Sequence, residues 1–338
     1  MRVFQLECDW GIANLRPATR AKPSPGPGQV LLQMRAASLN NRDLVVLERG
    51  YGNFTGTLPL IPVSDGVGEV AEIGAGVTRV AVGDRVCPGF FPNWVAGDPT
   101  LERLTASLGG PLDGAMTQWM CLSQEAVTKV PAHLDDVQAA ALPCAALTAW
   151  SALAVCSSTR PGDRVLVQGS GGVALFALQF ARAFGAHVTV ISSSDEKIER
   201  LKFLGADATI NYRSTPEWAK ASREFTAGRG YDQIIELGGE KTLGQSLRCI
   251  RPGGTISLIG VLSGTAMNAA LGHVVTRQVR LQGVTVGHRD GFEAMMRALE
   301  QHHIVPVIDS VHPFDDLLGA LAHLRSGTHF GKIAISHQ

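Results

Sequence analysis

The chain has 338 residues, of which 45% are hydrophobic and 18% are charged, a balance that excludes a disordered chain and suggests about two domains. Lysine and arginine together number 30, as do aspartate and glutamate, so the formal net charge is zero and no basic cluster indicates nucleic acid as a partner. Residues 1–7 lack the apolar core of a signal peptide, and the most apolar run, residues 139–156, is too short to span a bilayer comfortably. We therefore expect a cytoplasmic protein with no membrane partner.

The six cysteines stand at positions 8, 87, 121, 144, 156 and 249, and no two of them have CxxC spacing. This pattern fits free thiols in a reducing compartment better than a disulfide framework or a zinc cage.

Residues 1–125 are predicted to be rich in β-structure. Short apolar runs at residues 29–34, 68–73 and 85–87 are separated by Gly, Pro and Asp, which favour turns. The stretch 88–111 is long and irregular, and we interpret it as a surface excursion near a site. Its aromatic residues Phe90, Phe91 and Trp94 fit an apolar substrate wall, and they fit packing within the loop equally well.

From Asp163 onward, apolar strands alternate with amphipathic helices. Strands are predicted at residues 164–168, 187–191, 208–212, 233–237, 256–260 and 280–286, and helices at 172–184, 195–204, 216–226 and 241–250, the last closed by Pro252-Gly253-Gly254. This alternation predicts an α/β fold with a parallel sheet and right-handed crossovers. A helix at 291–302 follows, and the mixed pattern over 305–335 is expected to return to the first domain.

A glycine motif follows the first of these strands directly. It reads Gly169-Ser170-Gly171-Gly172-Val173-Ala174, which has the form G-x-G-x-x-A. The first glycine permits a tight turn, the second lets the backbone approach a pyrophosphate, and the small Ala174 allows the helix to pack on the strand. Because the start of the helix offers unpaired N–H groups to phosphates, the motif predicts a dinucleotide-binding site.

The end of the second strand indicates which dinucleotide binds. An NAD site normally has Asp or Glu there, about 20 residues after the glycines, but this strand ends in Ser192-Ser193-Ser194. We interpret Asp195 as the N-cap of the next helix. Hydroxyl groups, with Lys197 one turn later, suit a 2′-phosphate and favour NADP(H), although the serines also fit a polar loop and Lys197 a solvated helix residue.

With these motifs, the chain resembles the medium-chain dehydrogenase/reductase superfamily, in the branch of zinc-independent alcohol dehydrogenases and quinone oxidoreductases. The resemblance covers essentially the whole chain, and its other telling stretches are Asn40-Asn41-Arg42-Asp43, Gly66-Val67-Gly68-Glu69-Val70, Leu142-Pro143-Cys144, Leu147-Thr148-Ala149, Ile210-Asn211-Tyr212-Arg213 and His329-Phe330-Gly331-Lys332. It implies a GroES-like β-barrel catalytic domain over residues 1–125, completed by 288–338, and a Rossmann domain with a doubly wound parallel sheet over 126–287. It also implies a catalytic cleft between the two domains and a homodimer built by joining the Rossmann sheets.

The same resemblance implies further cofactor contacts. Thr148 is expected near the nicotinamide, and Tyr212 beside the phosphate on the adenosine side. Four residues at strand ends are expected to line the ribose and nicotinamide cleft, namely Leu237, Gly238, Ile259 and Gly260. Lys332 resembles a C-terminal basic residue that reaches the cofactor, although a surface lysine is an equal alternative.

The departures from zinc-containing relatives concern the metal ligands. Those relatives have Cys where this chain has Asn40, and a His-Glu pair where it has Ser64-Asp65. Only Cys144 matches a ligand position, and one thiolate with an amide and a hydroxyl makes a poor zinc site. We therefore expect no metal, and we interpret Cys144 as a small buried apolar residue.

Without zinc, hydrogen-bond donors and a proton source must stabilise the charge that develops on the substrate oxygen. Asn40 can orient substrate or cofactor, Arg42 can supply a fixed positive charge with Asp43 holding the loop, and the Tyr51 phenol can donate a proton. Each has a structural alternative: a turn at Asn40, an ion pair between Arg42 and Asp43, and a loop aromatic at Tyr51.

Three functions follow from these observations. The first is an NADP(H)-dependent oxidoreductase acting on a small carbonyl or alcohol, and the second is an NADPH-dependent enoyl or quinone reductase. A third is a cofactor-binding protein of low turnover, acting as a sensor or structural protein, which the lack of an unambiguous proton donor leaves open.

Overall fold

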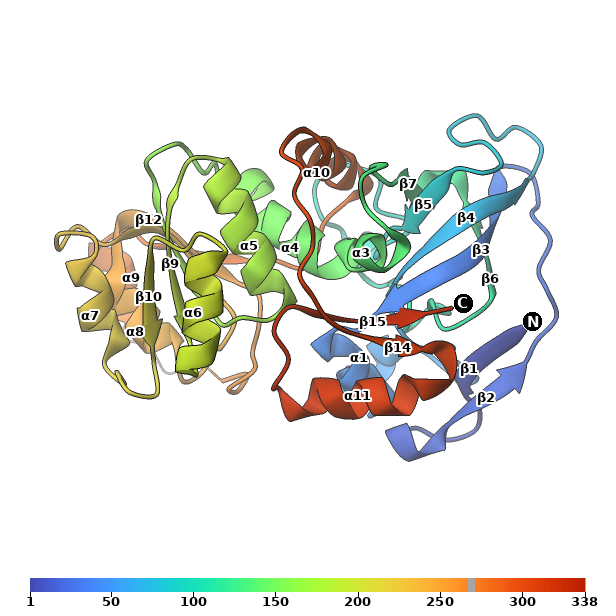
Figure 1. Cartoon of the computed structure of the whole chain (residues 1–338), viewed down its shortest axis with the longest axis horizontal. Coiled ribbons are helices and arrows are strands. Elements are labelled where there is room, and N and C mark those ends of the chain that lie inside the picture. The colour runs from blue at the N-terminus through green and yellow to red at the C-terminus, as the bar shows by residue number, and fades with distance from the viewer. Residues whose placement is uncertain (267–270, 338) are drawn as a thin grey trace. The chain divides into compact units, whose positions relative to one another are not determined.

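A computed structural model describes residues 1–266 and 271–337 of the chain (Figure 1). The chain divides into two compact units, one formed by Met1–Leu147 with Val286–Gln338 and the other by Thr148–Thr285. The domain boundaries predicted after residues 125 and 287 stay a prediction.

The first unit is mainly β-structure. Its strands are β1 Arg2–Leu6, β2 Leu15–Thr19, β3 Gln29–Ser38, β4 Asp65–Ile73, β5 Arg85–Pro88, β6 Trp119–Ser123, β7 Val127–Lys129, β14 Ile308–Pro313 and β15 Lys332–Ser336. Its helices are α1 Asn41–Leu47, α2 Leu101–Leu104, α3 Asp136–Ala140, a π-helical turn Leu142–Ala146, α10 Arg289–Gln301 and α11 Leu317–Ser326. Short 3₁₀ turns lie at Ile12–Asn14, Gly52–Thr55, Gln124–Ala126 and Phe314–Asp316.

Strand β3 organises this unit. The main sheet has the order β14-β15-β3-β4-β5-β7, and β6 also pairs with β3, while β1 and β2 form a separate ladder. Ser38 at the end of β3 lies opposite Asp65 of β4 on one side and Ala334 of β15 on the other. The C-terminal strand, red in Figure 1, therefore meets the start of β4 through the blue β3. This pairing brings segments far apart in sequence to one place.

The second unit contains a six-stranded parallel sheet. Its strands are β8 Arg164–Gln168, β9 His187–Ser192, β10 Ala208–Asn211, β11 Tyr231–Glu236, β12 Ile250–Leu258 and β13 Arg280–Gly283. Its helices are α4 Leu147–Trp150, a π-helical turn Ser151–Val155, α5 Gly172–Ala183, α6 Asp195–Phe203, α7 Trp218–Glu224, α8 Leu243–Cys249 and α9 Leu271–Thr276. The sheet order is β10-β9-β8-β11-β12-β13, so the winding direction reverses between β8 and β11. The prediction of a doubly wound α/β domain together with a GroES-like domain in the same chain is confirmed.

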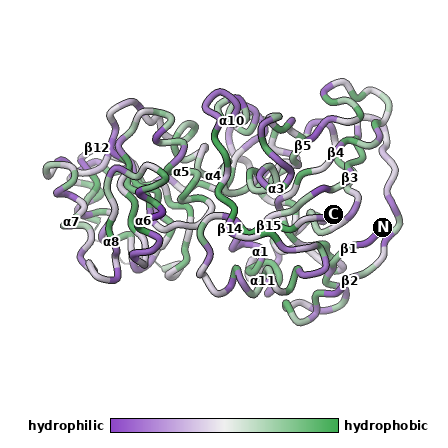
Figure 2. The backbone as a smooth tube through the Cα atoms, viewed as in Figure 1, coloured by the Kyte–Doolittle hydropathy of each residue, from purple (hydrophilic) through white to green (hydrophobic). Residues whose placement is uncertain are grey.

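The helices of the second unit differ in how much of their surface is buried, in line with how many apolar residues they contain. Helix α5 is apolar over most of its surface, with Ala174, Leu175 and Phe176 buried, whereas α6 buries only Ile198 and Leu201. Figure 2 shows this contrast as a hydrophobic α5 and a hydrophilic α6. A helix that is apolar around most of its surface, such as α5, is buried on several sides, whereas a helix with one apolar stripe, such as α6, packs on one side only.

Two local predictions need correction in detail. The helix predicted over 241–250 ends at Cys249, as α8, and Pro252-Gly253-Gly254 lie in an irregular part of β12 between its paired residues Ile250 and Thr255. The stretch 88–111 is a surface excursion in part, with residues 96–102 exposed, but its aromatic residues Phe90, Phe91 and Trp94 are buried. Phe91 lies 4.6 Å from Phe90 and 5.9 Å from Trp94 between ring centroids, so these aromatic residues pack against one another.

Candidate functional site

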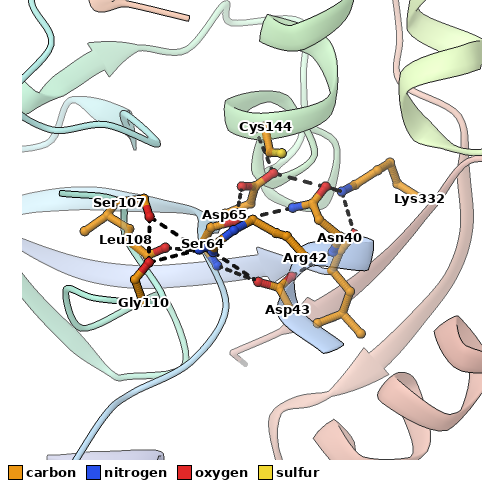
Figure 3. Close-up of polar contacts among 11 residues, drawn as sticks. Asn40, Arg42, Asp43, Ser64, Asp65, Ser107, Leu108, Gly110, Cys144 and Lys332 are labelled. Atoms are coloured by element: carbon orange, nitrogen blue, oxygen red, sulfur yellow. Dashed lines mark hydrogen bonds and ion pairs between the residues drawn. The ribbon is translucent and has the colours of Figure 1, made fainter. Parts of the chain in front are cut away.

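A buried polar cluster forms in the first unit where β3, β4 and β15 meet (Figure 3). Asn40 directly precedes α1, Ser64 directly precedes β4, Asp65 begins that strand, and Lys332 begins β15. Ser64 and Asp65 are completely buried, and Lys332 is 3% exposed. The alternative that Lys332 is a surface lysine is therefore wrong.

The side chains of this cluster form a closed ring of polar contacts. The Lys332 ammonium donates to Asn40 Oδ1 at 2.6 Å, and Asn40 Nδ2 donates to Ser64 Oγ at 3.4 Å. Ser64 Oγ donates to Asp65 Oδ1 at 2.8 Å, and Asp65 Oδ2 lies 4.0 Å from the ammonium. Lys332 also donates to the Leu39 carbonyl oxygen at 2.6 Å. The ring fixes the orientation of the Asn40 amide, since both its ends are engaged.

Cys144 joins this cluster from the π-helical turn Leu142–Ala146. Its backbone N–H donates to Asp65 Oδ2 at 3.0 Å. Burial raises the pKa of the Cys144 thiol well above its usual range, and the neighbouring Asp65 carboxylate raises it further. The thiol is therefore protonated at neutral pH. The residue is half-buried, so the predicted small buried side chain is only partly enclosed.

Asp43 ties helix α1 to β4. Its carboxylate accepts hydrogen bonds from the backbone N–H groups of Asn40 and Ser64, at 2.7 and 3.2 Å. Burial raises the pKa of Asp43 to about 6, against the opposing effect of the Arg42 charge. Asp43 thus acts on the cluster through the backbone.

Arg42 holds a neighbouring loop. Its guanidinium donates to the carbonyl oxygens of Leu108 and Gly110 at 2.9 and 3.0 Å, and it lies over the Phe90 ring at 4.8 Å. The predicted contact with Asp43 is present at 3.6 Å between nitrogen and oxygen. With these partners, the guanidinium positions the segment around residues 107–110.

Tyr51 is 45% exposed and precedes the 3₁₀ turn Gly52–Thr55. Desolvation raises the pKa of its phenol, partly offset by the Arg42 charge, so the phenol keeps its proton at neutral pH. Of the four predicted catalytic residues, Asn40, Arg42 and Asp43 share direct contacts, and Tyr51 is accessible to solvent.

In the second unit, the glycine motif forms the tight turn between β8 and α5. Gly169 has φ of 86°, which favours glycine, and Gly171 is the N-cap residue of α5. Gly172 and Val173 form the first turn of the helix, where backbone N–H groups lack partners within the helix. Ser170 is buried beneath this turn.

The end of β9 differs in detail from the prediction. Ser194, and not Asp195, is the N-cap residue of α6, because its hydroxyl accepts the Lys197 N–H at 3.3 Å. Asp195 is the first residue of the helix and accepts a hydrogen bond from Asn211 Nδ2 at 2.8 Å. The Ser192 hydroxyl donates to Ser170 Oγ at 3.3 Å.

The other predicted cofactor residues of this unit lie at several places. Thr148 is buried within α4, Ser193 is half-buried, and Tyr212 is 40% exposed just after β10. Leu237 and Gly238 follow β11, and Ile259 and Gly260 follow β12. A Cβ on Gly260 would lie 2.3 Å from the Leu237 carbonyl oxygen, so only glycine fits there. These four residues are therefore neighbours at the carboxyl ends of adjacent strands.

The sequence analysis missed two residues at these strand ends, Gln168 and Glu236. Both are polar residues at the end of a strand that otherwise pairs in the centre of the sheet, and both are buried. Buried polar residues usually have hydrogen-bond partners. A Gln and a Glu at the ends of two apolar strands were therefore the signal from which a polar network could have been predicted.

Two further observations concern the part of the chain that the structure describes. No helix there combines the length and the hydropathy of a membrane span. In the same residues, no three His, Cys, Asp or Glu side chains gather in a way that would hold a metal ion.

Comparisons with known proteins cover both units. Residues 26–132 match the family described as the alcohol dehydrogenase GroES-like domain, and residues 172–301 match the family described as zinc-binding dehydrogenase. A zinc-type alcohol dehydrogenase-like protein of Schizosaccharomyces pombe is 42% identical over 96% of both chains. Among solved structures, an NAD-dependent alcohol dehydrogenase is 30% identical with a TM-score of 0.91, and a 2-haloacrylate reductase is 27% identical with a TM-score of 0.82. Each match to these structures covers 100% of both chains.

Proposed function

Because the chain belongs to the medium-chain dehydrogenase/reductase superfamily, as an oxidoreductase of the alcohol dehydrogenase type, we propose that it transfers hydride between NADP(H) and a small carbonyl or alcohol without zinc. The observation that carries the metal-free part is the buried Lys332 ammonium, which donates to Asn40 Oδ1.

The donor set at the zinc-ligand positions of relatives does not fit a zinc ion. Only Cys144 supplies a sulfur ligand there, because the other two positions carry the Asn40 amide and the Ser64 hydroxyl. The Asn40 oxygen accepts from the ammonium, and both Asp65 oxygens accept hydrogen bonds. A divalent cation beside Lys332 would also meet a buried positive charge, which is strongly repulsive at low dielectric.

The residues of the first unit supply the chemistry that zinc supplies in relatives. When bound, the reduced nicotinamide supplies a hydride to the carbonyl carbon, and negative charge develops on the substrate oxygen. We assign the Asn40 amide, held by Lys332 and Ser64, to orienting the substrate or the cofactor. The Tyr51 phenol donates the proton that completes the alcohol. Arg42 and Asp43 keep the surrounding backbone in place.

The preference for NADP(H) rests on the end of β9. Ser192, Ser193 and Ser194 place hydroxyl groups where NAD sites carry a carboxylate, and Lys197 stands one turn into α6. The nearest carboxylate, Asp195, is engaged by Asn211, which supports a role in the local turn. The glycine turn at Gly169, with Thr148, Tyr212, Lys332 and the strand-end residues named above, completes the proposed cofactor contacts.

A second candidate is reduction of an activated alkene or a quinone. The likeness to a 2-haloacrylate reductase over the full length supports it. Alkene reduction needs the same hydride and a proton delivered to carbon in place of oxygen. The proposal of a homodimer rests on the family resemblance, and the mass of the protein in solution tests it. The proposal of a cytoplasmic location rests on residues 1–7 and on the cysteine pattern.

One assay tests the proposal. NADPH oxidation is followed in the presence of EDTA with an aliphatic aldehyde, an aromatic aldehyde, a ketone, an α,β-unsaturated ketone and a quinone. We expect turnover with a carbonyl substrate and an alcohol product. Reduction at the carbon–carbon double bond instead supports the second candidate, and activity that requires added zinc contradicts the metal-free mechanism. Cofactor binding without turnover would favour the low-turnover alternative, and tighter binding of NADH than NADPH contradicts the cofactor preference.

A further inference from the structure

Two buried polar side chains flank the point at which the sheet of the second unit reverses its winding. Gln168 is the last residue of β8 and Glu236 the last residue of β11, and these strands are adjacent. Gln168 is 4% exposed and Glu236 is completely buried. In open α/β sheets, ligands bind outside the carboxyl ends of the strands at such a reversal.

Glu236 is surrounded by donors. Its Oε1 accepts the backbone N–H groups of Gly238 and Gly239, both at 3.0 Å, and also the Thr242 hydroxyl. Its Oε2 accepts from Ser246 Oγ and from Gln168 Nε2, the latter at 2.7 Å. One carboxylate thus connects the end of β11, the following loop and helix α8.

Gln168 completes the network from the neighbouring strand. Its amide oxygen accepts the N–H groups of Leu237 and Gly238, at 3.1 and 3.2 Å, while its amide nitrogen contacts Glu236 and Ser246. Because Gln168 immediately precedes Gly169, this side chain connects the glycine turn to the loop after β11.

The consequence concerns the backbone N–H groups at residues 237–239. All of them donate to Gln168 or Glu236, so none points to a ligand. The glycine turn differs, because the first N–H groups of α5 have no partners within the helix. A phosphate therefore finds donors after β8, whereas the loop after β11 suits an uncharged group.

Burial of Glu236 is energetically costly. A buried carboxylate must recover its lost hydration, and the donors to Glu236 among residues 1–266 and 271–337 are neutral amides and hydroxyls. Such a network adds little net stability, but it selects one backbone conformation because any other leaves the charge without donors.

We infer that Gln168 and Glu236 are positioning residues for the dinucleotide. They hold the glycine turn and the loop after β11 in one arrangement, which directs the phosphates to the turn and the uncharged nicotinamide ribose to the loop. The inference rests on the proposed function, since it requires a nicotinamide dinucleotide as the ligand.

The substitution Glu236→Gln tests it. The new amide nitrogen must face either the N–H groups of Gly238 and Gly239 or the Gln168 amide, so at least one donor meets a donor. We expect the Kd for NADPH, measured by titration of protein fluorescence, to rise about tenfold, which corresponds to the loss of about one hydrogen bond to a charged group. At saturating cofactor, kcat should change far less than KM for the cofactor.

The exchange variant Q168E/E236Q supplies the rescue. The carboxylate placed on β8 can accept from the N–H groups of Leu237 and Gly238 and from the amide nitrogen placed on β11. The amide oxygen on β11 then accepts from Gly238 and Gly239, so each of these bonds has a counterpart. We expect the Kd for NADPH to return to within about threefold of wild type. If the exchange variant folds but binds as weakly as Glu236→Gln, the positioning role is wrong. The exchange variant also decides the matter if Glu236→Gln does not fold.

Tyr231→Phe is the matched control, because it removes a buried hydrogen bond, from Tyr231 Oη to the Ser222 carbonyl oxygen, at the opposite end of β11. It should lower Tm without changing the Kd for NADPH. An equal change in Kd for Tyr231→Phe and Glu236→Gln would show that both act through general stability and would overturn the inference. Wild-type protein that binds neither NADPH nor NADH would instead refute the proposed function itself.

Discussion

Asp65 of the first unit and Glu236 of the second are both completely buried carboxylates, but they are compensated in different ways. Asp65 lies 4.0 Å from the Lys332 ammonium, which reaches it from a strand at the other end of the chain. Glu236 relies on neutral donors, most of them within ten residues. Asp65 also accepts hydrogen bonds from Ser64 Oγ and the Cys144 N–H. The two carboxylates therefore differ in the cation that the whole fold brings near Asp65, whereas the donors to Glu236 among residues 1–266 and 271–337 are all neutral.

The largest expected effect tests the role of the Lys332 ammonium beside the Asp65 carboxylate. Lys332→Met removes the cation and leaves Asp65 buried beside an unpaired amide oxygen of Asn40. We expect the free energy of unfolding to fall by about 3 kcal/mol, because the buried Asp65 charge then keeps only the neutral donors Ser64 and the Cys144 N–H. Urea unfolding followed by circular dichroism measures it.

The double variant K332M/D65N is the control for this prediction. It removes both charges, and it should recover part of the loss if the ammonium acts mainly by compensating Asp65. A loss below about 1 kcal/mol in the single variant would contradict the comparison, since the ammonium would then behave as an exposed charge.

The second prediction concerns the chemical role assigned to the first unit. Tyr51→Phe removes the proposed proton donor without disturbing a buried contact, because Tyr51 is exposed. We expect kcat to fall about a hundredfold at unchanged Tm, the lower range for general acid catalysis. The same substitution at buried Tyr231 should show the reverse, a lower Tm with kcat retained. Full turnover in Tyr51→Phe would place the proton source elsewhere, such as an ordered water.

The second unit could be predicted from the sequence in most of its elements. Its signals are local: an apolar strand leads into glycines, and amphipathic helices follow at regular intervals. The errors arose where local signals compete. Pro252-Gly253-Gly254 indicates a break, and the pairing of β12 with β11 is indeed interrupted there, between Ile250 and Thr255, although β12 continues on both sides. Ser194 and Asp195 are both good N-cap residues, and only the hydrogen bond to Lys197 N–H distinguishes them.

The polar cluster of the first unit could be predicted only in part. Asn40, Arg42 and Asp43 were candidates because the stretch 40–43 resembles the superfamily and Asn40 stands at a zinc-ligand position of relatives. The contact between Lys332 and Asn40, in contrast, spans most of the chain. It depends on β15 pairing with β3, and one sequence without an alignment contains no signal for that register. Gln168 and Glu236 were missed for a related reason, since each is ordinary until the two strands are adjacent.

The pH dependence of stability tests a third titratable group of the first unit, the half-buried His337. Desolvation and the nearby Arg2 charge together lower the pKa of His337 from 6.5 to about 4. Between these two pH values the unfolded chain binds a proton that the folded chain does not, so this contribution to stability is present above pH 6.5 and is lost as the pH falls.

We expect wild-type protein to lose on the order of 1 kcal/mol relative to His337→Phe between pH 7 and pH 5. Urea unfolding at several pH values measures this difference. Parallel stability curves for the two proteins would contradict the assignment to His337.

The smallest expected effect concerns the cofactor side of the second unit, where a single residue has two proposed roles. Ser194 caps α6 through a hydrogen bond from Lys197 N–H, and it also belongs to the proposed site for the 2′-phosphate. Ser194→Ala should cost about 0.5–1 kcal/mol of unfolding free energy through loss of the cap. Ser194→Asp keeps a capping oxygen and should retain stability, but its carboxylate should weaken NADPH binding relative to NADH. If Ser194→Asp leaves the ratio of the two Kd values unchanged, Ser194 is a structural cap only, and selection of the dinucleotide lies with other residues after β9.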